Sequence, residues 1–431
     1  MTRLRTWPGA VALLLIAGSG VVGQEADPLA AALRNHAYTF ELRDGRLEGE
    51  GGELLLTEGR RARFFLIGEE HGVAEIPEIA SALFRALAPA GYRHLAIEVG
   101  DGLAERLEEA AREPDPVAGL VGFYSDHWPG APFYVLRTEA QLLVDAVAAA
   151  GEVDRGGPDT VPVLWGLDYD IMADRHALER LAELATTRAE AEAVERTRAR
   201  ADSAMDRALA EGNPGHFAMF GAPPEWFSEL RSAFDPAPGT EAVRILDQLE
   251  ETLAINRLFV SGQGWRSNQR RAEWNKRQLG RFWDRAASGG DDGPRVMFKF
   301  GATHVMRGRT FTDVYDLGTV ASALADARGE TSFHVMMIGG PGTRHAVMDP
   351  TVLEYVPAPV GIAGADWAAA FVAQADPERW TLYDLRPLRP LAAAGRLGTL
   401  ASSTEKVIHG YDALVVLSGS TPNEALALER R

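Results

Sequence analysis

Short apolar runs alternate with helical patterns in the first part of the chain. The run at 63–68 (RFFLIG) ends on a glycine, and apolar residues with helical spacing follow at 76–88. A second run at 94–99 precedes a helical pattern at 103–112, and a third run, VPVLWG, occupies 161–166. This rhythm predicts an α/β fold with a mostly parallel central sheet flanked by helices.

The same strand pattern returns near the C-terminus, after a long helical stretch. Between 173 and 287 the chain is rich in Ala, Glu, Arg and Leu at helical spacing, with breaks near 212–224 and 236–239. We therefore expect a core built from 24–172 and 288–431, around a helical insertion at 173–287 that forms one wall of a pocket. The later strands are expected at 295–300, 332–338, 380–385 and 413–417.

The remaining segments carry weaker patterns. Residues 24–60 predict one short helix at 27–35 and then polar, glycine-rich connections, and a helix is expected at 138–150. Residues 114–136 combine proline, glycine and aromatic residues without clear periodicity, so we expect a loop region that borders a pocket. Composition also predicts loops at 288–293 and 357–365.

The N-terminus has the pattern of a secretory signal peptide. Arg3 and Arg5 precede an apolar run at 10–17 and small residues up to Gly23. This run is shorter than the roughly 20 apolar residues that a transmembrane helix needs. We expect cleavage after Gly23, export to the periplasm or the medium, and no membrane contact by the mature protein.

Composition limits the chemistry further. The 431 residues include no cysteine, which excludes disulfides, thiolate metal sites and a lipid-modified N-terminal cysteine. The formal net charge of −17 argues against nucleic acids and anionic membranes as partners. Any metal would need His, Asp or Glu ligands.

The first candidate motif, GEEHG, follows the first core strand at 68–72. Glu69 and His71 are two residues apart and can point the same way in an extended turn. A carboxylate beside an imidazole fixes its tautomer and raises its basicity. The alternative is that Glu69 or Glu70 only favours the start of the next helix.

Three further polar residues stand at strand ends. Glu98 is costly near the end of an apolar strand unless it is paired. Asp168 follows the third strand and could equally cap the next helix. His304 follows the KFG sequence of the fourth strand. Because ligands bind beyond the carboxyl ends of strands in open α/β sheets, we expect these side chains to share one crevice with Glu69 and His71.

Other candidates have less context. Arg93 could pair with a carboxylate or lie on the surface, and His127 occupies a possible pocket loop. The chain contains no GxSxG elbow, no phosphate loop and no HExxH helix, and its one GxGxxG sequence, GSGVVG at 18–23, lies within the expected signal peptide rather than between a strand and a helix. Nucleotide cofactors and the common serine-hydrolase and zinc-protease mechanisms are therefore not supported.

Several short motifs together resemble the erythromycin-esterase family and its wider superfamily, which includes ChaN-like and Tiki-like proteins. The resemblance extends from about Phe64 to Glu424, with order and spacing more specific than any single motif. The matching motifs are FLIGEEHG at 65–72, AIE at 96–98, LYDLRP at 382–387, YDAL at 411–414 and STP at 420–422.

The resemblance implies ester or lactone hydrolysis without a cofactor. In it, His71 is the general base on water, Glu69 and Glu98 orient the base or bind the water, and His304 matches the last histidine of a His-Asn-x-His element. Gly301 and Ala302 replace the first two residues of that element, so a macrolide substrate is not implied. Arg271 is the candidate for a late helical arginine. The residues assigned to contact with a small ester or lactone are Glu70, Asp168, Arg93, Arg271, Lys299 and His127. An oxyanion would take its hydrogen bonds from the Gly72 amide, His304 or Lys299.

Two alternatives remain open. His71, Glu69, Glu98 and His304 are suitable ligand types for Mn²⁺, Co²⁺ or Zn²⁺, and Tiki-like relatives are described as metal-dependent proteases. ChaN-like relatives bind haem, which His71 or His127 could ligate.

Overall fold

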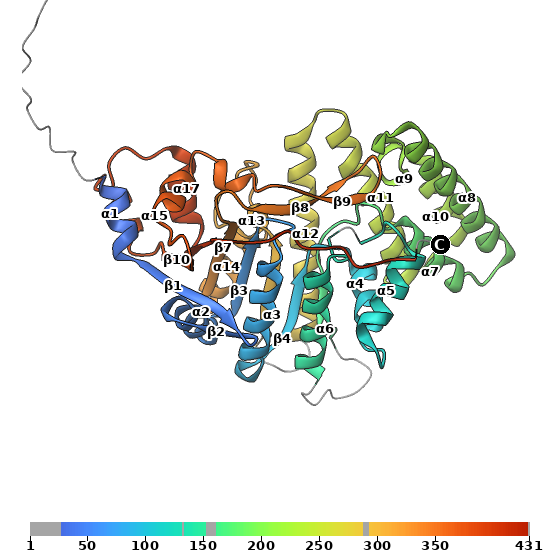
Figure 1. The fold of residues 1–431 in the computed structure, drawn as a ribbon. Coiled ribbons are helices and arrows are strands. Elements are labelled where there is room, and N and C mark those ends of the chain that lie inside the picture. The colour runs from blue at the N-terminus through green and yellow to red at the C-terminus, as the bar shows by residue number, and fades with distance from the viewer. Residues whose placement is uncertain (1–26, 132, 152–160, 288–292, 430–431) are drawn as a thin grey trace, which may run out of the picture.

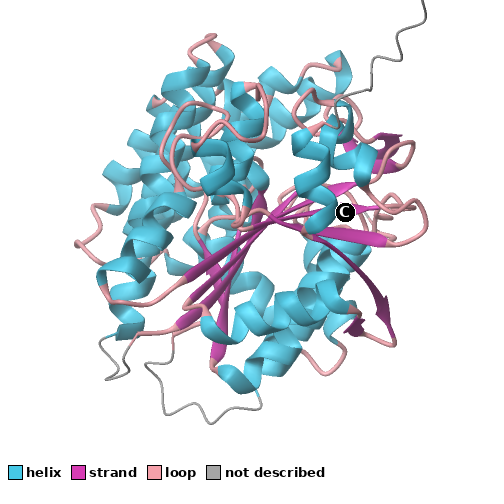
Figure 2. Ribbon diagram, turned by 90° about the vertical axis from the view of Figure 1, so that its left-hand side faces the viewer, coloured by secondary structure: helices cyan, strands magenta, loops and turns pink. Residues whose placement is uncertain are grey.

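The fold is a nine-stranded sheet with helices on both sides, as a computed structural model of the chain shows (Figures 1 and 2). The structure describes residues 27–131, 133–151, 161–287 and 293–429. The predicted signal peptide, 1–23, lies outside the described residues. Within them, no helix is long and apolar enough to cross a bilayer.

The sheet order is β2-β1-β10-β11-β7-β3-β6-β4-β5, and every pair from β11 to β5 is parallel. β2, β1 and β10 add an antiparallel edge. The α/β prediction with a mostly parallel sheet is confirmed. The strands are β1 (Ala37–Arg43), β2 (Arg46–Glu48), β3 (Phe64–Glu69), β4 (Tyr92–Ile97), β5 (Leu164–Gly166), β6 (Arg295–Gly301), β7 (Ser332–Gly339), β10 (Trp380–Asp384) and β11 (Ala413–Leu417).

Helices from the two ends of the chain cover the two faces of the sheet. Side chains along β3 alternate between faces: Phe65 and Ile67 join one buried cluster with α3 and α6, while Phe64 and Leu66 join another with α12 and α14. The helices of this core are α1 (Pro28–Asn35), α2 (Glu50–Arg61), α3 (Glu75–Leu87), α4 (Asp101–Ala110), α5 (Pro116–Asp126), α6 (Arg137–Gly151), α13 (Ala302–Val305), α14 (Leu317–Ala327), α15 (Ala369–Gln374), α16 (Leu388–Ala393) and α17 (Ser402–Gly410).

Between β5 and β6 the described chain is helical and has its own buried cluster, which includes Leu181, Phe227 and Leu246. Figure 1 shows α8, α9 and α10, in green, at one end of the molecule, and α12, in yellow, near its middle. α12 returns to the core and packs against β5 and α14. These helices are α7 (Asp174–Leu184), α8 (Arg188–Glu211), α9 (Ala218–Gly221), α10 (Glu225–Phe234), α11 (Glu241–Val260) and α12 (Gly264–Ala287).

Three segments differ from their expectation. The connections expected after 35 form β1, β2 and α2; Gly51 and Gly52 let α2 approach Phe40 and Leu47 closely, which hides the helical pattern. Part of the loop expected at 114–136 is α5. The loop expected from 357 begins inside a two-stranded ribbon of β8 (Arg344–Asp349) and β9 (Glu354–Pro359). β9 pairs only with β8, and a free strand edge tolerates prolines.

Candidate active site

The candidate site lies at the carboxyl edge of four neighbouring parallel strands, β3, β6, β4 and β5. Glu69 is the last residue of β3, Glu98 follows β4 and Asp168 follows β5. β6 ends at Gly301, and the short helix α13 then carries His304. The structure thus brings together the strand-end residues that the sequence singled out.

His71 is the most exposed member of this cluster, with 32 % of its side chain accessible. Its Nδ1 lies 2.9 Å from Oε1 of Glu69, and its Nε2 lies 3.7 Å from Oε2 of Glu98. The ring stacks on Phe133 at 4.2 Å between centroids, which holds its plane. Because a carboxylate accepts at Nδ1, that nitrogen carries the proton and Nε2 is left as the acceptor.

The turn that presents His71 depends on Gly72. This glycine has φ +80° and lies against the backbone of Ala346 in β8, where any side chain would collide. Its carbonyl accepts hydrogen bonds from the amides of Ala346 and Asn423, both at 2.9 Å. The ribbon and the C-terminal segment therefore clamp the turn.

Gly301 gives the imidazole its space. A Cβ at this position would lie 2.9 Å from Nε2 of His71 and 3.4 Å from Oε2 of Glu98. Its amide donates to Oε2 of Glu98 at 2.6 Å. The glycine that departs from the resembled motif is thus the residue that this arrangement of His71 and Glu98 requires.

Arg271, from α12, binds two of the strand-end carboxylates. Its Nη2 donates to Oε1 of Glu98 at 2.7 Å, and its Nε lies 2.9 Å from Oδ1 of Asp168. The guanidinium also lies over the ring of Tyr169, 4.7 Å from its centroid. Within the described residues its Nη1 makes no hydrogen bond, and 17 % of the side chain is exposed. One donor of Arg271 therefore remains free for a ligand.

His304 joins from the other side of Glu98. Its Nε2 lies 3.5 Å from Oε1 of Glu98, and its Nδ1 lies 2.7 Å from Oδ2 of Asp316. Asp316 also caps α14 through the amide of Leu317. Asp316 was not predicted from the sequence, because an aspartate before a helix is already explained by its role as a helix cap.

Lys299 lies behind His71 and is completely buried. Its Nζ lies 2.6 Å from Oε1 of Glu69 and 2.6 Å from Oε1 of Glu139, which comes from α6. Glu139 was missed, because a glutamate in the first turn of a helix is favourable there without any further role. Lys299 has no access to a substrate, so it does not contact one as expected and instead supports Glu69.

The buried glutamates of the site differ in charge: two have lowered pKa values, and the third has a raised pKa. Burial opposes the charge on Glu69, but Lys299 and His71 outweigh it and lower its pKa to about 2. Glu98 also has a pKa of about 2, since His71, His304 and Arg271 outweigh burial. Burial, with the nearby charge of Glu69, raises the pKa of Glu139 to about 8 despite Lys299.

Both histidines are more basic than usual. Burial disfavours the charged ring of His71, but the carboxylates of Glu69 and Glu98 outweigh it and raise the pKa above 6.5. Burial and Arg271 oppose the charge on His304, but Asp316 and Glu98 raise its pKa as well. The site therefore holds two strong imidazole bases around one ionised carboxylate.

Three residues expected at the site lie elsewhere. The carboxylate of Glu70 accepts the amides of Gly339, Gly361 and Ile362, each at 3.0 Å, and so joins two loops. Arg93 lies near the amino end of β4, away from the site, and donates to the carbonyls of Ala88 and Tyr92. His127 stacks on Phe123 and contacts Glu179 of α7.

The carboxylates of the cluster do not suit a divalent metal. Glu69 is bound to Lys299, while Glu98 and Asp168 are bound to Arg271, so a metal ion would lie beside two cations. Among the described residues no three His, Asp or Glu side chains are placed to hold a metal. His127, named as a haem ligand, has both ring nitrogens engaged, with the carbonyl of Phe123 and with Glu179.

Comparison with known proteins finds relatives by structure alone. No family model and no curated protein sequence matches the chain. A mutant of erythromycin esterase EreC in its open conformation has a TM-score of 0.61 at 16 % identity, over 91 % of this chain and 100 % of that one. A protein from Bacillus cereus has a TM-score of 0.55 at 11 % identity, over 93 % and 98 %. A succinoglycan biosynthesis protein has 0.56 at 12 %, over 93 % and 99 %. These likenesses establish the fold and a distant relation to erythromycin esterase at the level of the fold.

Proposed function

We propose that this protein is a hydrolase that cleaves a small ester or lactone, with His71 as general base on water. One observation carries the proposal: Nε2, the ring nitrogen of His71 not bound to Glu69, lies 3.7 Å from Oε2 of Glu98, and 32 % of the His71 side chain is exposed. The esterase fold supports the substrate class.

The base is built for proton transfer from water. Glu69 holds the Nδ1 proton, so the lone pair on Nε2 faces Glu98. A water molecule between them donates to Nε2 and to the carboxylate of Glu98, which orients its remaining lone pairs towards an ester carbonyl. His71 removes the proton as the C–O bond forms. Positioned proton transfer of this kind contributes about 10²–10⁴-fold.

The negative charge that forms on the carbonyl oxygen needs donors. Arg271 and His304 supply the candidates, since Nη2 of Arg271 and Nε2 of His304 both lie at Oε1 of Glu98 and, within the described residues, Nη1 of Arg271 is free. In the cation, His304 donates one proton to Asp316 and keeps the other for the oxyanion or for the leaving alkoxide. Lys299 takes no part in this, because its ammonium is enclosed by Glu69 and Glu139.

The proposal includes no metal or other cofactor, because Lys299 and Arg271 already neutralise the carboxylates of the site. It also includes export, which rests on the N-terminal pattern of Arg3, Arg5 and the apolar run at 10–17. Of the ten histidines in the chain, His71 and His304 are the two whose imidazoles form the proposed site.

Ester hydrolysis by purified protein, with excess chelator present, tests the proposal. The panel runs from activated aryl esters to lactones and macrolactones. We expect turnover that survives chelation and falls at least about 10²-fold in His71→Ala. His409→Ala, which alters an exposed histidine of α17, is the matched control and keeps full activity. Turnover that is absent on every ester, that needs an added metal, or that is equal in the two variants overturns the proposal.

A further inference from the structure

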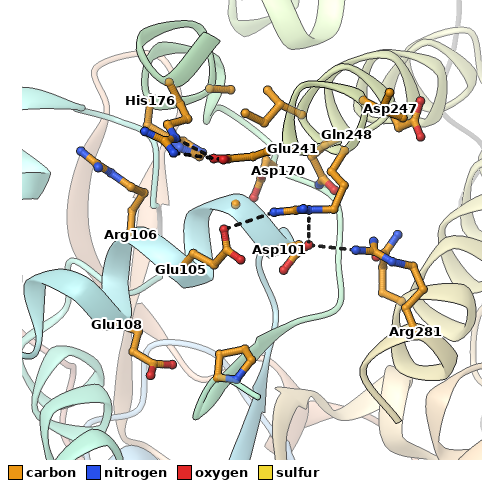
Figure 3. Close-up of a pocket in the computed structure, with 18 of the residues that line it drawn as sticks. Asp101, Glu105, Arg106, Glu108, Asp170, His176, Glu241, Asp247, Gln248 and Arg281 are labelled. Carbon is orange, nitrogen blue, oxygen red and sulfur yellow. Dashed lines mark hydrogen bonds and ion pairs between the residues drawn. The ribbon is translucent and has the colours of Figure 1, made fainter. Parts of the chain in front are cut away.

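A cavity of about 980 Å³, separate from the candidate active site, lies at the β5 edge of the sheet, between α4, α11 and α12 (Figure 3). His71, Glu98 and His304 do not line it. It is nevertheless a neighbour of the candidate active site, because Gln248 and Trp274 line the cavity and donate to the carbonyl of Asp168. The loop after β5 therefore lies between this cavity and the candidate active site.

The charges that line the cavity balance one another. Seven arginines face seven aspartate and glutamate residues, so the lining has no net charge in a chain whose net charge is −17. Asp101 shows the arrangement: Arg281 donates to it at 3.1 Å, and Arg244 lies 3.4 Å from it and 3.6 Å from Glu105 (Figure 3). Most of the lining arginines are paired in this way, so an anion at one of them would also meet a carboxylate, and a cation at a paired carboxylate would also meet an arginine.

The lining also includes the buried polar side chains of His176 and Asp170, and one of them has an atom without a hydrogen-bond partner among the described residues. His176 is 5 % exposed, and its Nε2 has no hydrogen-bond partner within the described residues. Burial lowers its pKa to about 3, so the ring is neutral and presents one donor and one acceptor. Asp170 is 6 % exposed and uses one oxygen to accept the amide of Gly100 at 2.6 Å. Burial raises the pKa of its carboxyl to about 7. Such groups favour hydrogen bonds with an uncharged partner.

An apolar strip completes the lining. Trp274, Ile245, Val161 and Pro162 all line the cavity, and both Trp274 and Ile245 are 8 % exposed. Arg277 already lies over the ring of Trp274, 5.5 Å from its centroid, so the more exposed apolar surface comes from the half-buried Val161 and Pro162. Apolar side chains beside many donors and acceptors suit a ligand with one apolar and one polar face.

We propose that this cavity is a binding site for a neutral polyhydroxylated molecule, a mono- or disaccharide. Hydroxyl groups both donate and accept, and so they match a lining in which guanidinium and carboxylate groups alternate. The C–H face of a sugar ring matches the apolar side chains of Val161 and Pro162. The volume lies within the range of small-molecule sites, about 300–1,000 Å³. The proposal does not depend on ester hydrolysis.

Titration calorimetry on the purified protein tests it with glucose, galactose, N-acetylglucosamine, maltose and cellobiose, and with phosphate and citrate as charged comparators. We expect saturable binding of at least one neutral sugar and none of the two anions. His176→Phe and Arg244→Ala should each weaken that binding about ten-fold or more, since each removes a polar partner. Arg244 is partly exposed, so Arg244→Ala keeps the fold even where His176→Phe does not.

Matched controls make the result specific. His409→Phe and Arg207→Ala alter exposed residues on α17 and α8, and both should bind the sugar as the unaltered protein does. His71→Ala should also bind equally, so a failure of the hydrolase proposal leaves this test intact. No saturable binding of any neutral sugar overturns the inference. Binding of anions alone, or equal binding by the cavity variants and their controls, overturns it as well.

Discussion

The ammonium of Lys299 lies 2.6 Å from Oε1 of Glu69, the same oxygen that lies 2.9 Å from Nδ1 of His71. A buried cation thus compensates the carboxylate that orients the proposed base. It also lies 2.6 Å from Oε1 of Glu139, but the raised pKa of that acid leaves it mostly protonated at neutral pH, so Lys299 chiefly balances Glu69.

Lys299→Met should destabilise the protein by about 3–5 kcal/mol, because it leaves the buried carboxylate of Glu69 without its cation. Urea unfolding at neutral pH measures the change. Lys406→Met is the control: its ion pair with Asp313 is partly exposed, so its loss should cost less than about 1 kcal/mol. Equal losses in the two variants would contradict the structural role of Lys299.

The pH dependence of hydrolysis should report His71. The base acts when neutral, and Glu69 and Glu98 raise its pKa, so kcat/KM should rise with pH through a pKa above 6.5. Glu69→Gln removes the largest attraction for the proton, and the acid limb should move to lower pH. It also loosens the tautomer, so kcat should fall about 10²-fold. A full pH–rate profile of both proteins measures this. If the acid limb does not move, Glu69 does not set the pKa of the catalytic base.

The effect of Glu139→Gln on the free energy of unfolding should become more stabilising as pH rises. The pKa of Glu139 is raised to about 8, so this group contributes stability below its unfolded pKa near 4.5 and loses it as pH rises towards 8. Glutamine mimics the protonated acid and cannot ionise. Relative to the unaltered protein, the variant should gain unfolding free energy between pH 5 and pH 9 in urea titrations. A difference independent of pH would show that Glu139 is ionised throughout.

Gly301→Ala should impair catalysis more than stability. Its Cβ would lie 2.9 Å from Nε2 of His71 and would displace the ring from Glu98. The backbone there, φ −50° and ψ 137°, is allowed for alanine, so the fold should persist. We expect kcat to fall about ten-fold or more, as misplacement by about 1 Å can cost up to 10².

Gly280→Ala is the matched control, because nothing lies within 4 Å of a Cβ at that site in α12. It should stabilise the protein by about 0.5–1 kcal/mol without changing kcat. The two alanine variants, compared by circular dichroism and steady-state kinetics, therefore separate space at the base from general effects of glycine replacement. Full activity in Gly301→Ala would contradict the placement of His71.

Part of this architecture could be predicted because local patterns determine it. Apolar runs marked the core strands, and the rule that parallel strands share a carboxyl edge placed Glu69, Glu98, Asp168 and His304 together. Glu139 and Asp316 could not be found in this way. Each has an adequate local role in a helix, and only the packing of α6 and α14 against the sheet brings them to Lys299 and His304.

Glu70 shows the opposite kind of error, because it was expected at the site and lies elsewhere. It neighbours Glu69 in the chain, yet successive residues of an extended strand point to opposite faces, so its carboxylate reaches the loops at Gly339 and Gly361. The sequence gives two adjacent glutamates and cannot decide which of them faces His71. Likewise β1 and α2 were missed because the helix contains the glycines that let it lie close to the strand.

Glu69 and Lys299 stand 230 residues apart in the chain, although their strands are direct neighbours. During synthesis β3 therefore cannot pair with β6 until the intervening chain has been made. At about 5–20 residues per second this takes on the order of ten seconds or longer. Through that interval an apolar strand with open edges has no partner, and the helices of 174–287 emerge and fold first. Slow closure of the sheet, rather than formation of its helices, should therefore limit folding and make the nascent chain dependent on chaperones.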